Sequence, residues 1–195
     1  MIIVGLTGGI GSGKTTIGKF FKSMGIPVYI ADKEAKDLMK RSKVIRRKLV
    51  KLFGEKAYVG DELNRSYLSS KIFADEALLS KMNAIVHPKV GAHFKRWLKK
   101  QDAPYIIKEA AIIFENGLEG QYDVIITVVA DEDLRIGRVV KRDNSSIDRV
   151  KAIINNQLSD DEKIKKSDFI IENNDLDTAK KQTEEIHQLL LQRTA

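Results

Sequence analysis

A glycine-rich segment near the N-terminus has the residue types and spacing that bind a triphosphate. The pattern G-x-x-x-x-G-K-[ST] runs from Gly8 to Thr15. Its glycines permit backbone conformations that point successive N–H groups at phosphate oxygens. Lys14 can reach the β- and γ-phosphates, and the Thr15 hydroxyl can ligate Mg²⁺. The residues expected to bind ATP through this segment are Gly9, Gly11, Ser12, Gly13, Lys14, Thr15 and Thr16.

The elements on either side of this loop are those that a phosphate loop requires. Residues 2–7 are a short apolar run with β-branched side chains, which predicts a buried strand. Apolar residues then recur at helical spacing until Gly25, and residues 27–31 predict a second strand. A strand, a glycine-rich turn, a helix and a strand open a parallel sheet. A chance glycine-rich turn would lack this context.

The rest of the chain predicts an α/β P-loop fold with two additions. Strand patterns return at residues 105–108, 122–129 and 168–171, and an amphipathic helix at 175–191. The segment between the second and third predicted strands, residues 33–101, has a largely helical pattern and is rich in lysine. This segment is too long to be a simple crossover between two parallel strands. We expect a doubly wound parallel five-stranded sheet with an inserted helical subdomain and a small helical lid. The expected parts of this single domain are a core (1–32, 102–130 and 167–195), an insert (about 33–101) and a lid (about 131–166).

Composition limits the classes of protein. The 195 residues are 43% hydrophobic and 31% charged, which is a globular composition, and they include no cysteine. No apolar run is long enough to cross a bilayer, and the N-terminus lacks the features of a signal peptide, so we expect a cytoplasmic protein. The formal net charge of +7 favours anionic partners without choosing among them.

Other P-loop classes fit less well. The guanine-reading N-K-x-D and switch D-x-x-G patterns of GTPases do not occur, and neither does the L-S-G-G-Q of transporter ATPases. A nucleic-acid-stimulated ATPase remains the alternative, because the chain is basic and residues 124–129 lead into Asp131, Glu132 and Asp133. Motors of that kind usually need a longer chain, so a small-molecule kinase is the preferred hypothesis.

A kinase needs carboxylates near the transferred phosphate. Asp32 follows the second predicted strand, and ligands of open α/β sheets bind at that edge. It could orient the acceptor, or it could simply cap the next helix. Glu109 ends the third predicted strand at the same edge and could act on Mg²⁺ through water, or it could be a surface charge.

A kinase also needs cations that close over the phosphates. Arg135, Arg138 and Arg142 are spaced by three and four residues, which places them on one face of a helix. A cover segment could present this face to phosphates, although a solvated basic face has the same pattern. His87-Pro88 predicts a turn into the next helix, with proline at its first position. The three histidines have no metal-ligand spacing, so we expect no zinc.

Taken together, these residues resemble the dephospho-CoA kinase family over nearly the whole chain. The resemblance is carried by Leu6–Thr16, Ala31-Asp32, His87-Pro88, Ile112–Glu115, Arg138–Asp143, Gln157 and Asn173-Asn174. Two positions depart from the family pattern: Ile30 stands where an Asp is common, and the segment after Glu109 lacks a proline.

The resemblance implies phosphorylation of the ribose 3′-hydroxyl of dephospho-CoA by Mg·ATP, without nucleic acid or membrane partners. It implies that Asp32 orients or deprotonates the acceptor, and that Lys14 and Arg138 act on the transferring phosphate. Arg142 would bind ATP from the lid, Glu109 and His87 would lie at the substrate, and the insert would form the substrate subdomain.

Overall fold

The computed structural model describes residues 1–193, without the side chains of residues 73, 74 and 76. The chain divides into two compact units. Unit 1 consists of Met1–Ile30 and Asp102–Ala195, and unit 2 consists of Ala31–Gln101.

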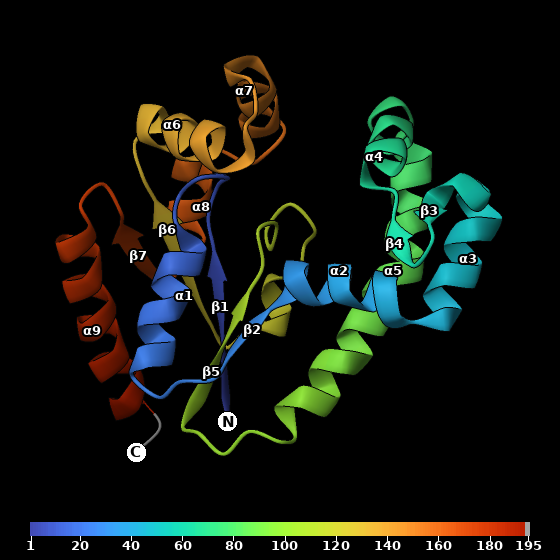
Figure 1. Ribbon diagram of the computed structural model, residues 1–195. Helices are drawn as coiled ribbons and strands as arrows, with labels where there is room; N and C mark the ends of the chain where they lie inside the picture. The colour runs from blue at the N-terminus through green and yellow to red at the C-terminus, as the bar shows by residue number, and fades with distance from the viewer. Residues whose placement is uncertain (194–195) are drawn as a thin grey trace. The chain divides into compact units, whose positions relative to one another are not determined.

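Unit 1 is built on a five-stranded parallel sheet (Figure 1). Its strands, in spatial order, are β2 (Val28–Ile30), β5 (Tyr105–Glu109), β1 (Ile2–Thr7), β6 (Val124–Val129) and β7 (Phe169–Glu172). Every pairing is parallel. The carboxyl ends of all five strands therefore lie at one edge, and the expected parallel sheet is confirmed.

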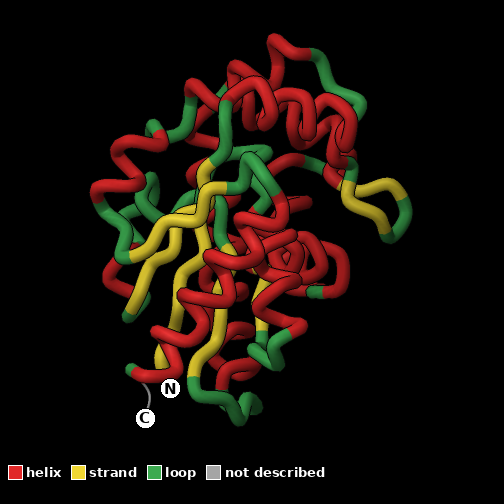
Figure 2. The backbone as a smooth tube through the Cα atoms, turned by 90° about the vertical axis from the view of Figure 1, so that its left-hand side faces the viewer, coloured by secondary structure: helices red, strands yellow, loops and turns green. Residues whose placement is uncertain are grey.

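Helices cover both faces of this sheet, as the doubly wound prediction requires. Alternate residues of β1, Val4 and Leu6, are fully buried against α1 (Lys14–Ser23) and α9 (Leu176–Gln192). On the opposite face, α8 (Asp160–Lys165) packs on β6, where Thr127 is hydrogen-bonded to Ser167 at 2.6 Å. Figure 2 shows the strands in yellow running side by side with helices next to them.

A helical pair, α6 (Glu132–Asp143) and α7 (Ile147–Asn155), follows β6. Asn144 ends α6 in the left-handed conformation, with φ of 48°, and the Ser146 hydroxyl caps α7 by accepting the N–H of Arg149 at 3.3 Å. The two helices share a small apolar cluster of Ile136, Val139 and Val150. The side chain of Ile10, from the glycine-rich loop, packs against the same cluster. Apolar packing therefore joins this helical pair to the loop.

Unit 2 contains four helices and a short hairpin among the described residues. The helices are α2 (Ala31–Arg41), α3 (Lys43–Phe53), α4 (Arg65–Ala74) and α5 (Glu76–Leu98). The hairpin consists of β3 (Tyr58–Val59) and β4 (Glu62–Leu63) and follows the 3₁₀ turn η1 (Glu55–Ala57). Sequence patterns did not predict this hairpin, because strands of two residues show no periodicity. Unit 2 has a hydrophobic core formed by its own residues, in which Ile45, Leu49 and Ala57 are fully buried.

The prediction of a turn at His87-Pro88 is wrong, because α5 runs through both residues. Proline removes one helical N–H and crowds the preceding turn, which usually ends a helix. Here apolar residues on both sides of the proline, Ile85, Val86 and Val90, pack into the unit 2 core, while Pro88 itself is exposed. Packing therefore outweighs the cost of the lost hydrogen bond. Asp75 caps the start of α5 by accepting the N–H groups of Ala77 and Leu78.

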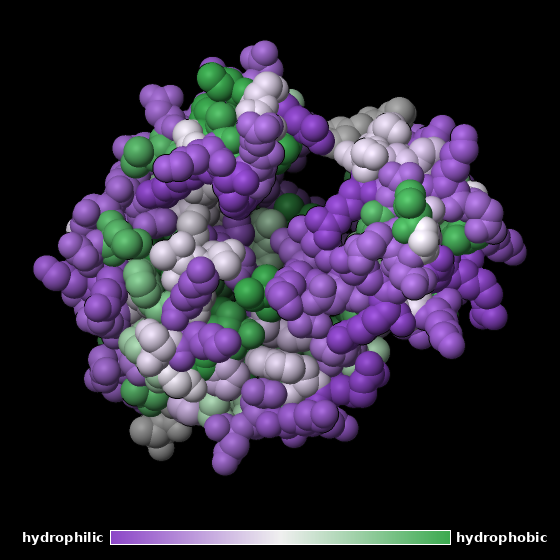
Figure 3. All heavy atoms as spheres, in the orientation of Figure 1, coloured by the Kyte–Doolittle hydropathy of each residue, from purple (hydrophilic) through white to green (hydrophobic). Residues whose placement is uncertain are grey.

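Much of the positive charge of unit 2 lies on its surface, which is mostly hydrophilic in Figure 3. Arg46 forms an ion pair with Asp61 at 2.9 Å, and its guanidinium stacks over the Tyr58 ring. Lys43 and Arg47 are exposed on α3. Within the described part of the chain, no helix combines the length and the apolar character needed to span a membrane.

Candidate active site

The loop between β1 and α1 adopts a backbone that only glycine accommodates. Gly11 has a φ of 80° and Gly13 a φ of 96°, both in the left-handed region. A methyl group on Gly13 would also overlap the side-chain amide of Asn173. No side chain of the described residues caps the start of α1. The positive end of the helix dipole is therefore directed at the mouth of the loop, where an anion is stabilised.

Lys14 bends back over this loop. Its Nζ donates hydrogen bonds to the carbonyl oxygens of Gly8, at 2.7 Å, and Gly9, at 3.1 Å. A phosphate oxygen is a stronger acceptor for an ammonium group than a neutral carbonyl is. The lysine is thus held at the position from which it can bind a phosphate chain.

Two oxygen-bearing side chains meet beside the loop. The Thr15 hydroxyl donates to Glu109 Oε1 at 2.9 Å. Glu109 ends β5 and is only 6% exposed, whereas Thr15 is exposed. A hydroxyl and one carboxylate are hard oxygen donors, and Mg²⁺ typically uses one or two such ligands together with phosphate oxygens and water. The described residues contain no group of three or more His, Cys, Asp or Glu that would form a complete protein cage.

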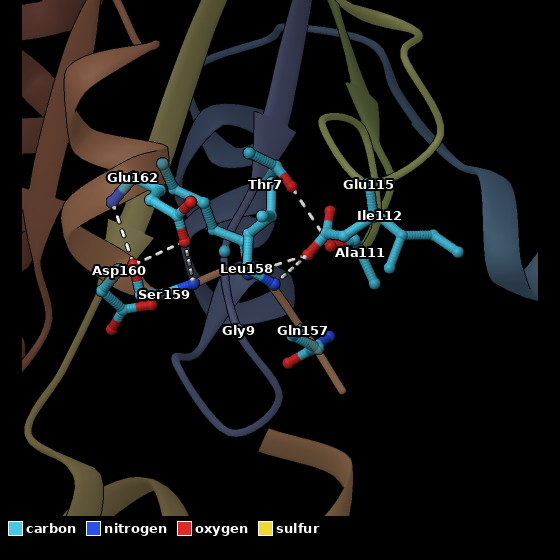
Figure 4. Close-up of polar contacts among 12 residues, drawn as sticks. Thr7, Gly9, Ala111, Ile112, Glu115, Gln157, Leu158, Ser159, Asp160 and Glu162 are labelled. Atoms are coloured by element: carbon cyan, nitrogen blue, oxygen red, sulfur yellow. Dashed lines mark hydrogen bonds and ion pairs between the residues drawn. The ribbon is translucent and has the colours of Figure 1, made fainter. Parts of the chain in front are cut away.

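The segment that follows β5 is tied to β1 although it lacks the proline of the family pattern. The Thr7 hydroxyl donates to the carbonyl oxygen of Ala111 at 3.3 Å, and Figure 4 shows the two residues facing each other. Backbone N–H of Ala110 donates to the carbonyl of Leu6. Hydrogen bonds to the neighbouring strand therefore hold this turn in place.

Arg135 does not share a solvent-facing surface with Arg138 and Arg142, so that expectation is corrected. Arg135 is 6% exposed, and its Nη1 forms an ion pair with Asp160 Oδ2 at 2.8 Å. Its Nε donates to the carbonyl of Ile10 at 3.0 Å. A side chain in the first turn of α6 points toward the protein here because α8 and the loop both lie against it.

Arg138 is connected to the loop through Asn173 by two successive hydrogen bonds. Its Nη2 donates to the carbonyl of Asn173 at 2.8 Å, and the Asn173 side chain donates to the carbonyl of Ser12 at 2.7 Å. Arg138 Nη1 is buried and makes no hydrogen bond to any described residue. A buried donor of this kind has a strong tendency to bind an acceptor, such as a phosphate oxygen.

Arg142 lies one helical turn beyond Arg138 and is exposed. Two hydrogen bonds of 2.7 Å join its guanidinium to the carboxylate of the adjacent Asp143. These bonds raise the pKa of Arg142 above its ordinary value. An exposed pair of this kind adds little to stability, so the guanidinium can exchange its partner for a phosphate at low cost.

Two residues that the sequence identified only through the family pattern, Gln157 and Glu115, support the loop. Gln157 Oε1 accepts the N–H of Ile10 at 2.9 Å. Glu115 Oε1 accepts the N–H of Leu158 at 3.2 Å and lies 3.1 Å from Nζ of the fully buried Lys163. Figure 4 shows Glu115 and Leu158 in contact beside Gln157. No spacing rule in the sequence could have paired residues so distant along the chain.

The remaining two predicted site residues belong to unit 2. Asp32 lies in the first turn of α2, directly after β2 in the chain, and is exposed. His87 is exposed on α5. Their roles toward a substrate stay predictions.

A glycine-rich loop followed by Lys14 and Thr15, at the carboxyl edge of a doubly wound parallel sheet, defines a P-loop nucleotide-binding protein. A model of the dephospho-CoA kinase family matches residues 2–178. The chain belongs to the dephospho-CoA kinase family, and a kinase of this family uses ATP as phosphate donor.

Individual relatives agree with this assignment. The chain is 40% identical to a dephospho-CoA kinase of Bacteroides fragilis over 88% of its own length and 84% of the relative's. It is 37% identical to the enzyme of Fusobacterium nucleatum, covering 89% and 90% of the two chains. A crystal structure of a protein from Thermus thermophilus superposes with a TM-score of 0.88 at 31% identity, covering 96% of each chain.

Proposed function

We propose that this protein transfers the γ-phosphate of ATP to the ribose 3′-hydroxyl of dephospho-CoA, giving CoA and ADP in the last step of CoA biosynthesis. The observation that carries the proposal is the phosphate loop, with Lys14 across its mouth and the Thr15–Glu109 pair beside it, in a chain of this family. Dephospho-CoA is the substrate that its relatives are named for.

The loop residues would bind and polarise the phosphate chain. Backbone N–H groups of the loop other than that of Ile10 would surround the β- and γ-phosphates, and Lys14 would neutralise part of their charge. Bound Mg²⁺, held by the Thr15 hydroxyl with Glu109 adjacent, would supply further neutralisation between these phosphates. The transition state of phosphoryl transfer is loose, so positioning and charge balance account for most of the rate.

Arg138 and Arg142 would act on the transferring group from α6. Arg138 Nη1 is buried and has no hydrogen-bond partner among the described residues, which suits it to a phosphate oxygen. Arg142 is exposed and paired with its neighbour Asp143, a solvent-accessible contact that it can leave to turn toward ATP. The helical pair α6 and α7 would then form the lid that keeps competing water from the phosphate.

Asp32 would align the acceptor hydroxyl and accept its proton. Its place directly after β2, at the carboxyl edge of the sheet, is where open α/β sheets bind ligands. Glu109 and His87 would contribute to the substrate side, and unit 2 would bind the remainder of dephospho-CoA. A cytoplasmic location and the absence of nucleic acid partners complete the proposal.

The test measures ADP release from Mg·ATP in the presence of dephospho-CoA, with adenosine, AMP and single-stranded DNA as parallel acceptors or effectors. Release that requires dephospho-CoA, with CoA as the product in a mass spectrum, is the expected result. ADP release stimulated by DNA alone would overturn the proposal and support a nucleic-acid-dependent ATPase.

A further inference from the structure

Both backbone polar groups of Ile10, in the glycine-rich loop, are hydrogen-bonded to side chains from outside the loop. Its N–H donates to Gln157 Oε1 at 2.9 Å, and its carbonyl oxygen accepts from Arg135 Nε at 3.0 Å. We infer that Arg135 and Gln157 are positioning residues, which fix the orientation of the two peptide groups on either side of the Ile10 Cα atom and thereby the shape of the phosphate loop. The inference deepens the proposed function and rests on it for the identity of the nucleotide.

The side chain of Ile10 is held as well. It packs against the cluster of Ile136, Val139 and Val150 between α6 and α7. Ile10 is thus the one non-glycine residue in the first four positions of the loop, and its side chain, N–H and carbonyl are all engaged. Its N–H cannot also bind a phosphate. What this residue contributes is the geometry of the neighbouring N–H groups.

Arg135 is a rigid support rather than a mobile cation. Its ion pair with Asp160, at 2.8 Å, is largely buried, and a planar guanidinium can hold this carboxylate and the Ile10 carbonyl at once. The guanidinium also packs directly on Gly9, where any Cβ atom would overlap it. A Cβ atom on Gly11 would lie 2.5 Å from the backbone oxygen of Arg135. Two of the loop glycines are therefore required by their contact with Arg135.

Gln157 is anchored through the residue that follows it. The N–H of Leu158 is bound by Glu115, whose carboxylate lies 3.1 Å from the ammonium group of Lys163. Lys163 is fully buried in α8, and Leu158 packs into the cluster around Ile113 and Phe114. As Figure 4 shows, residues 157–160 run between Glu115 and the loop. The support for Ile10 is therefore fixed to the body of unit 1.

The two positioning residues stand at opposite ends of the α6–α7 segment. Arg135 lies in the first turn of α6, and Gln157 comes two residues after α7. The base of this segment is bound to the loop, while Arg142, at the far end of α6, is exposed. A shift at the base of α6 or α7 would consequently change the phosphate loop directly.

The test uses Arg135→Met and Gln157→Met, with the exposed Lys141→Met and Asn156→Met as matched controls. Binding of tripolyphosphate, of adenosine and of dephospho-CoA is measured by calorimetry. We expect both variants to lose about tenfold or more in tripolyphosphate affinity, the effect of one lost hydrogen bond to a buried group. Affinities for adenosine and dephospho-CoA should stay within about twofold, since neither depends on the loop peptide. Equal losses for all three ligands, or none, would overturn the inference.

Tripolyphosphate binding needs no acceptor, so its result stands whether or not CoA is formed. A failure of the proposed function would instead appear as absent CoA production with loop binding intact. In addition, kcat per folded molecule should fall in both variants while the KM for dephospho-CoA is unchanged. The folded fraction of each variant is measured by circular dichroism, because unfolded protein alone would lower the apparent kcat at constant KM.

Gln157→Glu is a more conservative variant, because it keeps a side-chain oxygen that can accept the Ile10 N–H. It allows the test to be made even if Gln157→Met does not fold. Amide hydrogen exchange at Ile10 should be slow in the natural protein and in Gln157→Glu. It should be at least about tenfold faster in Gln157→Met, because the amide loses the Gln157 Oε1 acceptor. Equal exchange rates in Gln157→Glu and Gln157→Met would contradict the role of this hydrogen bond.

Discussion

Thr15 and Glu109, separated by 94 positions, are joined by a hydrogen bond of 2.9 Å from the threonine hydroxyl to Oε1 of the carboxylate. Thr15 is the second residue of α1, and Glu109 is the last residue of β5, next to β1 in the sheet. This relationship places a carboxylate against the residue that a phosphate loop uses for Mg²⁺.

The first prediction concerns this carboxylate. Glu109→Gln should lower kcat about 10–100-fold and raise the Mg²⁺ concentration for half-maximal rate, as loss of a partner around a metal site usually does. Steady-state rates across a Mg²⁺ titration measure both effects. The control is Glu172→Gln, an exposed glutamate at the end of β7, which should behave like the natural protein. An unchanged Mg²⁺ dependence in Glu109→Gln would remove Glu109 from the metal site.

Lys14→Met tests the lysine that crosses the loop. Charge stabilisation by one well-placed donor is typically worth about 10²–10³-fold in kcat, and a loss of that size is expected here. Lys19→Met, an exposed lysine on the same helix, serves as the control. If Lys14→Met lowered kcat by about threefold or less, far smaller than the expected loss, Lys14 would not have this role.

Asp32→Asn should abolish most turnover and leave ATP affinity nearly unchanged. A general base contributes about 10²–10⁴-fold, and the amide keeps the shape but neither the charge nor the basicity. Single-turnover rates and ATP titrations separate the two quantities. Asp37→Asn is the matched control, because Asp37 lies on the same helix and its carboxylate is bound to Lys33 at 3.0 Å. Near-normal turnover in Asp32→Asn would show that Asp32 does not orient or deprotonate the acceptor hydroxyl.

The stability of the protein should fall as the pH drops below about 6.5. His187 is 9% exposed, with Nδ1 2.6 Å from the Tyr105 hydroxyl, and burial lowers its pKa from the ordinary value of 6.5. The unfolded chain therefore binds more protons at this site than the folded chain, so the stability present above 6.5 is lost as the pH falls toward the folded pKa. Urea unfolding at pH 7.5 and 5.5 measures the change.

His187→Gln should reduce this pH dependence, whereas His87→Gln should not, because His87 is exposed. Identical pH profiles for the two variants would show that another group is responsible.

Pro88→Ala should stabilise the protein. Alanine restores a helical N–H and removes the crowding of the ring, and a proline in a helix interior costs about 3 kcal/mol relative to alanine. Since α5 already accommodates the proline, a gain of about 1–3 kcal/mol in the free energy of unfolding is expected. Chemical denaturation measures it, with the neighbouring exposed Lys89→Ala as control. A destabilised Pro88→Ala would mean that the proline has a favourable role in α5.

Patterns that are local in the chain predicted local structure well. The strand before the loop, the helix after it and the caps Asp75 and Ser146 all follow from neighbours within a few residues. The same local logic failed at Pro88, where burial of Val86 and Val90 decides the outcome. It also failed at the hairpin of β3 and β4, whose strands are too short for alternation to be visible.

Patterns of charge on a helix were a poorer guide. A spacing of three and four residues placed Arg135, Arg138 and Arg142 on one face. What each guanidinium binds depends on the groups that pack over that face. Arg135 binds Asp160 and the Ile10 carbonyl, Arg138 binds the Asn173 carbonyl, and Arg142 binds the adjacent Asp143.

The sequence by itself determined the phosphate loop, the parallel sheet and the family, because each depends on residue types at fixed short spacings or in a fixed order. Only the tertiary structure decided which distant side chains meet: Thr15 with Glu109, and Ile10 with Arg135 and Gln157. Such contacts form when separate helices and strands pack, and their partners lie 94 to 147 positions apart. No periodicity along the chain encodes a distance across a folded core.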